Sequence, residues 1–225
     1  MIWDSTYALL IPAFILAIYA QGKVQNTFNK YMKYRNSGGY TGADVARRLL
    51  DLNGLYDVPI ELISGNLTDH YDPSKRVMRL SRDVYSSTSI AALGVAAHET
   101  GHAIQHKEGY FPLRLRNSIV PIANFGSNLA WPLFLLGLIM GYAPLLDFGI
   151  ILFSAAVLFQ IVTLPVEFNA SNRAIKILGS EGILNQDEIR PAREVLNAAA
   201  LTYVAATLTS ILQLFRLIIL RERRD

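Results

Sequence analysis

The sequence predicts a mainly α-helical membrane protein with three to four transmembrane helices and a small α+β domain. Hydrophobic residues make up 52% of the 225 residues and charged residues only 17%, below the roughly 25% of an average soluble domain. The deficit is concentrated, because Asp147 is the only charged residue between Arg116 and Glu167. The apolar blocks on either side of Asp147 match two helices of about 20 residues that cross a bilayer.

The first predicted transmembrane helix is an uncleaved anchor in residues 1–21, with an uncharged run of about 17 residues. No basic residue precedes this run, as a cleaved signal peptide would require. Basic residues follow it instead, at Lys23, Lys30, Lys33 and Arg35. By the positive-inside rule, we expect the segment after the anchor to be cytoplasmic.

Residues 22–116 are predicted to form the small α+β domain. A capping box at Thr41 and Asp44 opens a helix that is expected to end at Asn53-Gly54. Two strands are expected at Val58–Ile63 and Val77–Leu80, and a turn at Asp69–Ser74. A second helix is expected from about Ser89.

Residues 117–166 predict a transmembrane hairpin. Its helices are expected at Ile119–Leu146 and Phe148–Val166, joined near Pro144 and Asp147. Two crossings return the chain to the side from which it started, so the segment that follows the hairpin is expected beside the small domain.

The last two segments are a polar return, 167–194, and a C-terminal part, 195–225. Val195–Phe215 is uncharged and predicts a fourth transmembrane helix. Its several hydroxyl side chains leave two alternatives, a re-entrant helix or an amphipathic helix on the cytoplasmic face. The basic tail that begins at Arg221 favours these alternatives, because a fourth crossing would place it outside.

Residues 98–102 read His-Glu-Thr-Gly-His and match the H-E-x-x-H pattern. Residues at i and i+4 share one helix face, so His98 and His102 can bind one metal ion together. Glu99 is offset from that face and is placed to act as a general base toward water. At this content of His and Glu, a random arrangement gives about 0.006 matches, which disfavours a surface helix with ordinary histidines.

A third metal ligand is expected, because catalytic zinc usually has three protein ligands and one open position. Glu167 is the first charge after the predicted hairpin, on the same side of the membrane as His102, and it is the preferred third ligand. His106 is the alternative, although ligands on three successive helical turns lie about 6 Å apart. Gln105 also stands where a longer zinc motif has its chain-turning glycine. The alternative for Glu167 is a charge that marks the membrane boundary.

Other polar residues are candidates to orient the ligands or to stabilise the transition state. Ser171, for example, lies i+4 from Glu167 on a predicted helix. The candidates are Ser171, Asn172, Arg173, Tyr203, Tyr110 and His106. His70 is a candidate on the substrate side, and the alternative is a turn histidine bonded to its neighbours.

The composition also limits the partners. The chain has no cysteine, so a metal must be bound by His and carboxylate groups. We predict one catalytic Zn²⁺, although a His₂Glu set also suits other first-row metals. Nucleic acid is not expected, because no basic run with interleaved aromatics occurs. The expected partners are the lipid bilayer and protein or peptide substrates, among them membrane proteins.

Four stretches of the chain together resemble the YugP-type membrane zinc metallopeptidases. They are Leu67–Pro73, Arg79–Ser81, His98–Gln105 and Ala199–Val204. The resemblance covers nearly the whole chain, and it implies a zincin-like catalytic domain and neutral zinc peptidase activity.

The chain more distantly resembles the HtpX type of membrane peptidase, whose H-E-x-G-H motif is followed by a ligand glutamate in a Glu-x-x-x-Asp pattern. Residues 98–102 match the motif and Glu167 matches the glutamate, which implies a gluzincin-like ligand set. Ser171 stands where that pattern has aspartate. The analogy implies that Val77–Leu80 is the edge strand beside the metal-binding helix, where an extended substrate could add by backbone hydrogen bonds.

We therefore predict a multi-pass cell-membrane zinc metalloendopeptidase with its catalytic domain in the cytoplasm. The alternative is a zinc-binding membrane scaffold or regulatory protein without turnover. The presence of Glu99 argues against it, as does the usual preference of structural zinc for four protein ligands. An intramembrane protease is disfavoured, because only eight apolar residues, Ile90–Ala97, precede the motif.

Overall fold

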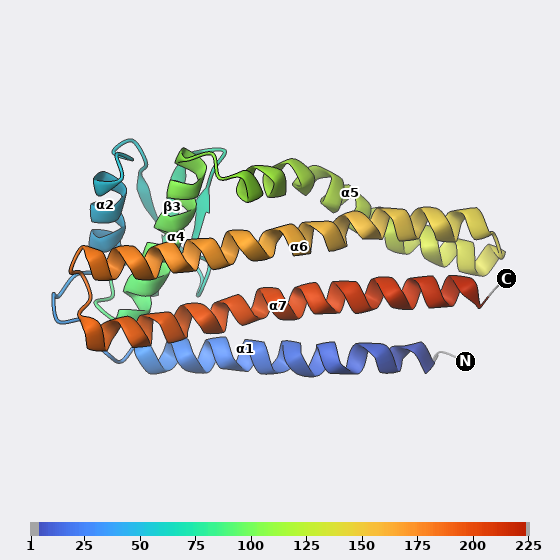
Figure 1. Ribbon diagram of the computed structural model, residues 1–225, viewed down its shortest axis with the longest axis horizontal. Coiled ribbons are helices and arrows are strands. Elements are labelled where there is room, and N and C mark those ends of the chain that lie inside the picture. Colours follow the sequence, from blue (N-terminus) through green and yellow to red (C-terminus); the bar gives the residue numbers. More distant parts are fainter. Residues whose placement is uncertain (1–4, 224–225) are drawn as a thin grey trace. The chain divides into compact units, whose positions relative to one another are not determined.

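The computed structural model describes residues 5–223, and these are mainly helical (Figure 1). The helices are a 3-10 helix at Ser5–Leu10, α1 (Ile11–Tyr31), α2 (Gly42–Leu52), α3 (Arg82–Tyr85), α4 (Ile90–Lys107), α5 (Phe111–Met140), α6 (Ala143–Ser180) and α7 (Gln186–Glu222). The strands are β1 (Ile60–Ile63), β2 (His70–Asp72) and β3 (Val77–Ser81). Residues 1–4 of the predicted anchor and 224–225 of the predicted basic tail lie outside the described residues.

The chain divides into two compact units. The mixed unit consists of residues 22–113 and 166–201 and contains all three strands. The apolar unit consists of residues 114–165 together with the chain up to Gln21 and from Thr202 onward. The long helices α1, α5, α6 and α7 contribute residues to both units.

The helix predicted from the capping box is confirmed as α2. The Thr41 side chain accepts a hydrogen bond from the Asp44 backbone N–H, and the Asp44 carboxylate accepts one from the Thr41 N–H at 2.9 Å. These two bonds satisfy N–H groups that the first turn leaves without helical partners. The helix ends at Leu52, as the Asn53-Gly54 pair predicts.

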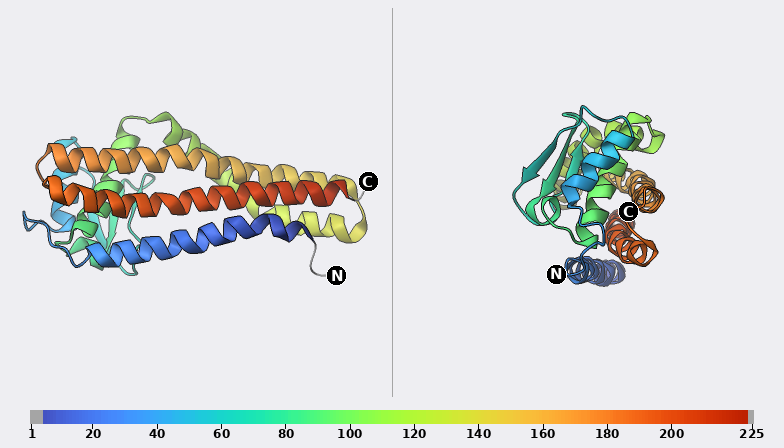
Figure 2. Two further views of the ribbon diagram at one scale, coloured as in Figure 1. Left: turned by 60° about the horizontal axis from the view of Figure 1, so that its bottom comes forward. Right: turned by 90° about the vertical axis from the view of Figure 1, so that its left-hand side faces the viewer.

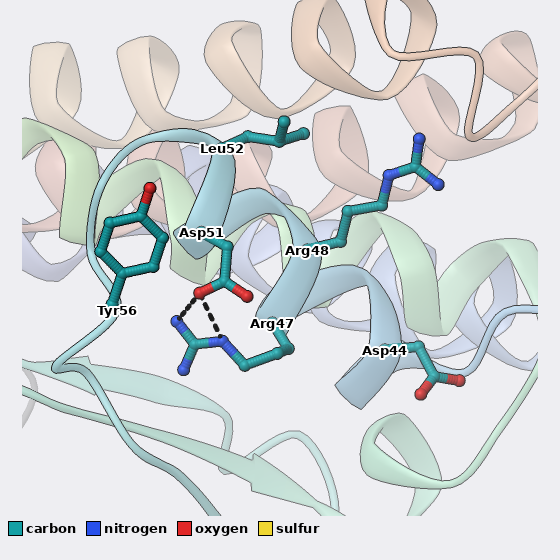
Figure 3. Close-up of a pocket in the computed structure, with 6 residues that line it drawn as sticks. All are labelled: Asp44, Arg47, Arg48, Asp51, Leu52 and Tyr56. Atoms are coloured by element: carbon teal, nitrogen blue, oxygen red, sulfur yellow. Dashed lines mark hydrogen bonds and ion pairs between the residues drawn. The ribbon is translucent and has the colours of Figure 1, made fainter.

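A shallow hollow on the surface of α2 is lined mainly by charged side chains and by Tyr56 (Figure 3). Arg47 forms an ion pair with Asp51 at 2.7 Å and donates to the backbone carbonyls of Leu55 and Val58. Because the Arg47 guanidinium is used in these contacts, it fixes the loop after α2 to the helix.

The three strands form one sheet in the order β1-β3-β2, with β1 parallel and β2 antiparallel to β3. The expected turn at Asp69–Ser74 is partly wrong, because His70–Asp72 pairs with β3 and only the residues after Asp72 turn. The expectation that Val77–Leu80 is an edge strand is also wrong. Since β3 has a neighbour on each side, the edge strands are β1 and β2.

The core of the mixed unit surrounds α4, which contacts α2, α3, β2 and β3 (Figure 1). The helix predicted from Ser89 is confirmed as α4, and the Ser89 side chain caps its first turn. One hydrophobic cluster joins Ala96 of α4 to Met78 of β3, and a second joins Leu93 of α4 to Leu178 of α6. Because α4 is packed on most of its surface, its polar side chains are held in fixed positions.

The apolar unit contains a hairpin of α5 and the first part of α6 (Figure 2). The chain turns at Gly141, which has a left-handed φ of 65°, and Tyr142. This turn lies just before Pro144, close to the predicted break, but Asp147 does not take part in it. Pro144 is the second residue of α6, where a missing N–H does not cost a helical hydrogen bond. Asp147 lies within α6 and accepts a hydrogen bond from Arg221 of α7 at 2.7 Å.

Two glycines allow α5 and α6 to approach closely in the hairpin. A Cβ at Gly126 would lie 2.5 Å from the carbonyl oxygen of Leu152, and a Cβ at Gly149 would lie 3.0 Å from that of Ala130. Small residues at such contacts are typical of packed membrane helices.

Four helices of the described chain are long and apolar enough to cross a membrane, judged by length and composition. They are Ser5–Tyr31, Phe111–Met140, Ala143–Ser180 and Gln186–Glu222. The last one runs without interruption through Val195–Phe215, whereas a re-entrant segment has to turn back. Its length and continuity therefore favour the fourth predicted span.

Candidate metal centre

His98, His102 and Glu167 converge in the mixed unit. The two histidines project from successive turns of α4, and Glu167 comes from α6. The two Nε2 atoms are 3.1 Å apart, and Glu167 Oε2 lies 3.3 Å from His98 Nε2 and 3.5 Å from His102 Nε2. These three atoms are close enough to bind one metal ion together.

The spacing of the three donor atoms fits a tetrahedral ion. In a tetrahedral zinc site with bonds of about 2.0–2.1 Å, neighbouring donor atoms lie about 3.3–3.4 Å apart. The observed distances of 3.1, 3.3 and 3.5 Å lie on both sides of that value. Two imidazoles and one carboxylate are also the donor set of His₂Glu catalytic zinc sites, which leave one position for another ligand. The residues therefore fit zinc.

Glu99 follows His98 on α4 but does not belong to the converging group. Its Oε2 accepts a hydrogen bond from the backbone N–H of Tyr71 on β2 at 2.9 Å. Burial raises the pKa of the Glu99 carboxyl, and the nearby His102 and His98 oppose that rise. A carboxylate with a raised pKa is a stronger proton acceptor near neutral pH.

Each imidazole of the group is hydrogen-bonded through its second ring nitrogen. His98 Nδ1 lies 3.1 Å from Ser171 Oγ, and His102 Nδ1 lies 3.0 Å from Gln105 Oε1. Such contacts orient the rings of metal-binding histidines and fix their tautomers. Ser171 is among the residues proposed from the sequence, whereas Gln105 is not.

His106, the alternative third ligand, lies outside the converging group. Its Nδ1 is 2.9 Å from the hydroxyl group of Tyr71 on β2. Tyr71 thus contacts α4 twice, through its hydroxyl group at His106 and through its backbone N–H at Glu99. No pattern in the sequence indicates these contacts, because they depend on how β2 pairs with β3.

The predicted residues that follow Glu167 occupy different environments. Asn172 is exposed. Arg173 donates through Nε to the side-chain oxygen of Asn169 at 2.8 Å and forms an ion pair with Glu108 at 2.6 Å. Its guanidinium is therefore engaged with neighbouring side chains.

The remaining candidates are Tyr203, Tyr110 and His70. Tyr203 belongs to the apolar unit, where its backbone carbonyl accepts a hydrogen bond from Thr207. The Tyr110 ring lies 6.0 Å from the guanidinium carbon of Arg173. His70 is exposed, and its Nδ1 is 2.8 Å from the carbonyl oxygen of Thr68, as the alternative of a turn histidine bonded to its neighbours predicts.

The fold and the site define a class of protein, a mainly helical membrane protein with a candidate His₂Glu metal site. The family described as "Putative neutral zinc metallopeptidase" matches residues 6–222. A protein of Bacillus subtilis (strain 168) described as "Putative membrane protease YugP" is 55% identical over 212 residues, which cover 94% of each chain. The chain therefore belongs to this zinc metallopeptidase family, and the resemblance drawn from its motifs is confirmed. No solved structure matches the chain.

Proposed function

We propose that the chain is a membrane-embedded zinc metalloendopeptidase with His98, His102 and Glu167 as metal ligands and Glu99 as general base. The observation that carries the proposal is the triangle of donor atoms at 3.1–3.5 Å, which fits tetrahedral zinc. Glu99, a buried carboxylate outside this triangle, directly follows His98 in the chain. A purely structural zinc site would not need such a group.

Peptide hydrolysis requires an activated water and a proton for the leaving amine. Zinc, when bound, would polarise the scissile carbonyl and lower the pKa of a water molecule. Glu99 would accept a proton from that water and later give it to the amine nitrogen. The raised pKa of Glu99 supports this role, and the Tyr71 N–H holds its carboxylate in one orientation.

The substrate pairing expected at the edge of β3 is excluded, because β3 is the central strand of the sheet. The Tyr71 N–H of the edge strand β2 is already bonded to the Glu99 carboxylate, so β2 orients the proposed base.

The site would lie on the cytoplasmic side of the membrane. Basic residues follow the first apolar helix at Lys23, Lys30, Lys33 and Arg35, which supports a cytoplasmic mixed unit. Glu167 follows the apolar part of α6 directly, so the site would be close to the membrane surface. Membrane proteins and their fragments are the substrates that such a position favours.

The decisive experiment compares zinc content and casein cleavage of the detergent-purified protein with those of Glu99→Gln and Glu167→Ala. We expect near-stoichiometric zinc in the wild type and in Glu99→Gln, with cleavage lost in Glu99→Gln. Zinc should be lost in Glu167→Ala. Glu181→Gln, a change of an exposed glutamate after α6, is the matched control and should keep both properties.

Three outcomes would contradict parts of the proposal. Retention of zinc in Glu167→Ala would move the third ligand elsewhere, with His106 as the first alternative. Equal cleavage by the wild type and Glu99→Gln would exclude Glu99 as the base. Bound zinc without cleavage of casein, or of membrane-protein substrates offered next, would favour the non-catalytic scaffold.

A further inference from the structure

Gln105 is a fully buried polar residue that connects α4 with the start of the mixed-unit part of α6. Its relative exposure is 0%, so its amide must find its partners inside the protein. Oε1 lies 3.0 Å from His102 Nδ1, while Nε2 donates to the Val166 carbonyl oxygen and to Asn169 Oδ1, both at 2.9 Å. One side chain thus contacts a proposed metal ligand and the residue just before another, Glu167.

The orientation of the Gln105 amide follows from the chemistry of its neighbours. Arg173 can only donate hydrogen bonds, and its Nε lies 2.8 Å from Asn169, so Asn169 must present its oxygen there. The same oxygen faces Gln105, as does the carbonyl oxygen of Val166. Both contacts require Gln105 to present its NH₂ group to α6, and its oxygen therefore faces His102.

This orientation determines the tautomer of His102. An amide oxygen can only accept, so His102 Nδ1 must carry a hydrogen and donate it to Gln105 Oε1. In a neutral imidazole the other nitrogen then has a free lone pair. That nitrogen, Nε2, is the atom that lies 3.1 Å from His98 Nε2 and 3.5 Å from Glu167 Oε2.

We propose that Gln105 is a positioning residue for metal binding, which fixes the His102 tautomer and holds the chain that carries Glu167. The proposal rests on the zinc site proposed above and adds a residue that the H-E-x-x-H pattern does not contain. Arg173 acts through Asn169 in the same chain of hydrogen bonds, and Glu108 holds Arg173 by its ion pair at 2.6 Å.

A carboxylate could not replace the Gln105 amide in this position. Glutamate could still accept a hydrogen bond from His102, but its second oxygen would face the oxygens of Val166 and Asn169. Both of those contacts would change from attractive to repulsive in a site without solvent. The amide is thus the group that can accept from the histidine and donate to α6 at the same time.

The test measures zinc affinity of the detergent-purified full chain by competition with a chromophoric chelator. Gln105→Met keeps the size of the side chain but removes both kinds of hydrogen bond, and Gln105→Glu keeps only the bond to His102. Thr100→Val is the matched control, because Thr100 is equally buried on α4 and its hydroxyl donates only within the helix, to the Ala96 carbonyl. Thermal unfolding of each metal-free variant shows whether it is folded.

We expect Gln105→Met and Gln105→Glu each to weaken zinc binding about 10- to 100-fold, the range found for residues that orient metal ligands. Thr100→Val should stay within about twofold of the wild type. The visible absorption bands of the Co²⁺-substituted protein should shift in both Gln105 variants but not in the control, because these bands report ligand geometry.

Zinc affinity in Gln105→Met within about twofold of the wild type would overturn the inference, and so would an equal loss in Thr100→Val. Wild-type zinc affinity in Gln105→Glu would show that the contact with His102 alone is enough. It would overturn the proposal that Gln105 also positions Glu167 by holding α6. This test does not measure peptide cleavage. Failure of the zinc-loaded wild type to cleave any substrate would therefore count against the proposed function alone.

Discussion

Gly101 of α4 lies directly against the backbone of Ala170 of α6. A Cβ built at Gly101 would stand 2.8 Å from the Ala170 carbonyl oxygen and 3.2 Å from its Cα. Because the obstacle is backbone rather than a flexible side chain, a larger residue would have to push the helices apart. Gly101 lies between the two histidines of the motif, and Ala170 lies one turn after Glu167, so this contact sets how closely Glu167 approaches the histidines.

Gly101→Ala is expected to weaken zinc binding more than about tenfold and to lower the stability of the fold by about 1–3 kcal/mol, the usual cost of overpacking. Gly94→Ala on the same helix is the matched control, because its Cβ would meet nothing closer than 3.7 Å, at the Ala192 carbonyl oxygen. The control gains helix propensity of up to about 1 kcal/mol and should be neutral or stabilising. Chelator competition and thermal unfolding measure both effects. Equal behaviour of the two variants would show that the close contact does not position Glu167.

Ser171 is expected to support His98 as Gln105 supports His102, because its Oγ lies 3.1 Å from His98 Nδ1. Ser171→Ala would remove the acceptor of the partly buried Nδ1–H and should weaken zinc binding about tenfold. Ser171→Asp supplies the carboxylate found there in the HtpX-type pattern, and it should bind zinc within about threefold of the wild type. The measurement is zinc affinity at one pH. Unchanged affinity in Ser171→Ala would mean that His98 is oriented by packing alone.

The parts of the fold that could be predicted from the sequence depend on local signals. The capping box at Thr41 and the cap at Ser89 act within one helical turn, so α2 and α4 were located correctly. β2 was missed because its three residues form a strand only through pairing with β3, and its Asp-Pro sequence indicates a turn. The join of the hairpin was expected near Pro144 and Asp147, but Pro144 lies in the first turn of α6, where proline is compatible with a helix.

The candidate site divides in the same way. The H-E-x-x-H pattern predicts His98, Glu99 and His102, and Glu167 is predicted because it is the first charge after an even number of membrane crossings. Gln105 lies three residues after His102, so helical periodicity places the two side chains on the same face of α4 and could have predicted their contact. Its partners Val166 and Asn169 are 61 and 64 residues away in the chain, so that part of its role could only come from the tertiary structure.

Removal of zinc is expected to lower the thermal stability of the mixed unit, because a ligand that binds only the folded state stabilises it. At a free zinc concentration 100 times the Kd, the gain is about 2.7 kcal/mol. For a chain of this size that corresponds to a fall in Tm of about 5–11 °C on chelation. Glu167→Gln should unfold at the same temperature with and without chelator, whereas the Glu181→Gln control should show the full shift. A full chelator effect in Glu167→Gln would show that zinc binds elsewhere.

The orientation of the mixed unit can be tested by labelling, because the chain contains no cysteine. Lys75 lies in the turn between β2 and β3, Glu181 follows α6, and Tyr142 lies between α5 and α6; all three are exposed. Single cysteines at these positions give one reactive thiol each. If α5 and α6 both cross the bilayer, a cysteine at position 142 must lie on the side opposite to the other two.

With a cytoplasmic mixed unit, a membrane-impermeant maleimide should label Tyr142→Cys in intact cells. It should label Lys75→Cys and Glu181→Cys only after the cells are permeabilised. The reverse pattern would place the metal site outside and would contradict the orientation inferred from Lys23, Lys30, Lys33 and Arg35. Labelling of all three in intact cells would mean that the α5–α6 hairpin does not cross. Since Lys75 and Glu181 belong to the same compact unit, different labelling of these two would contradict the arrangement of the mixed unit itself.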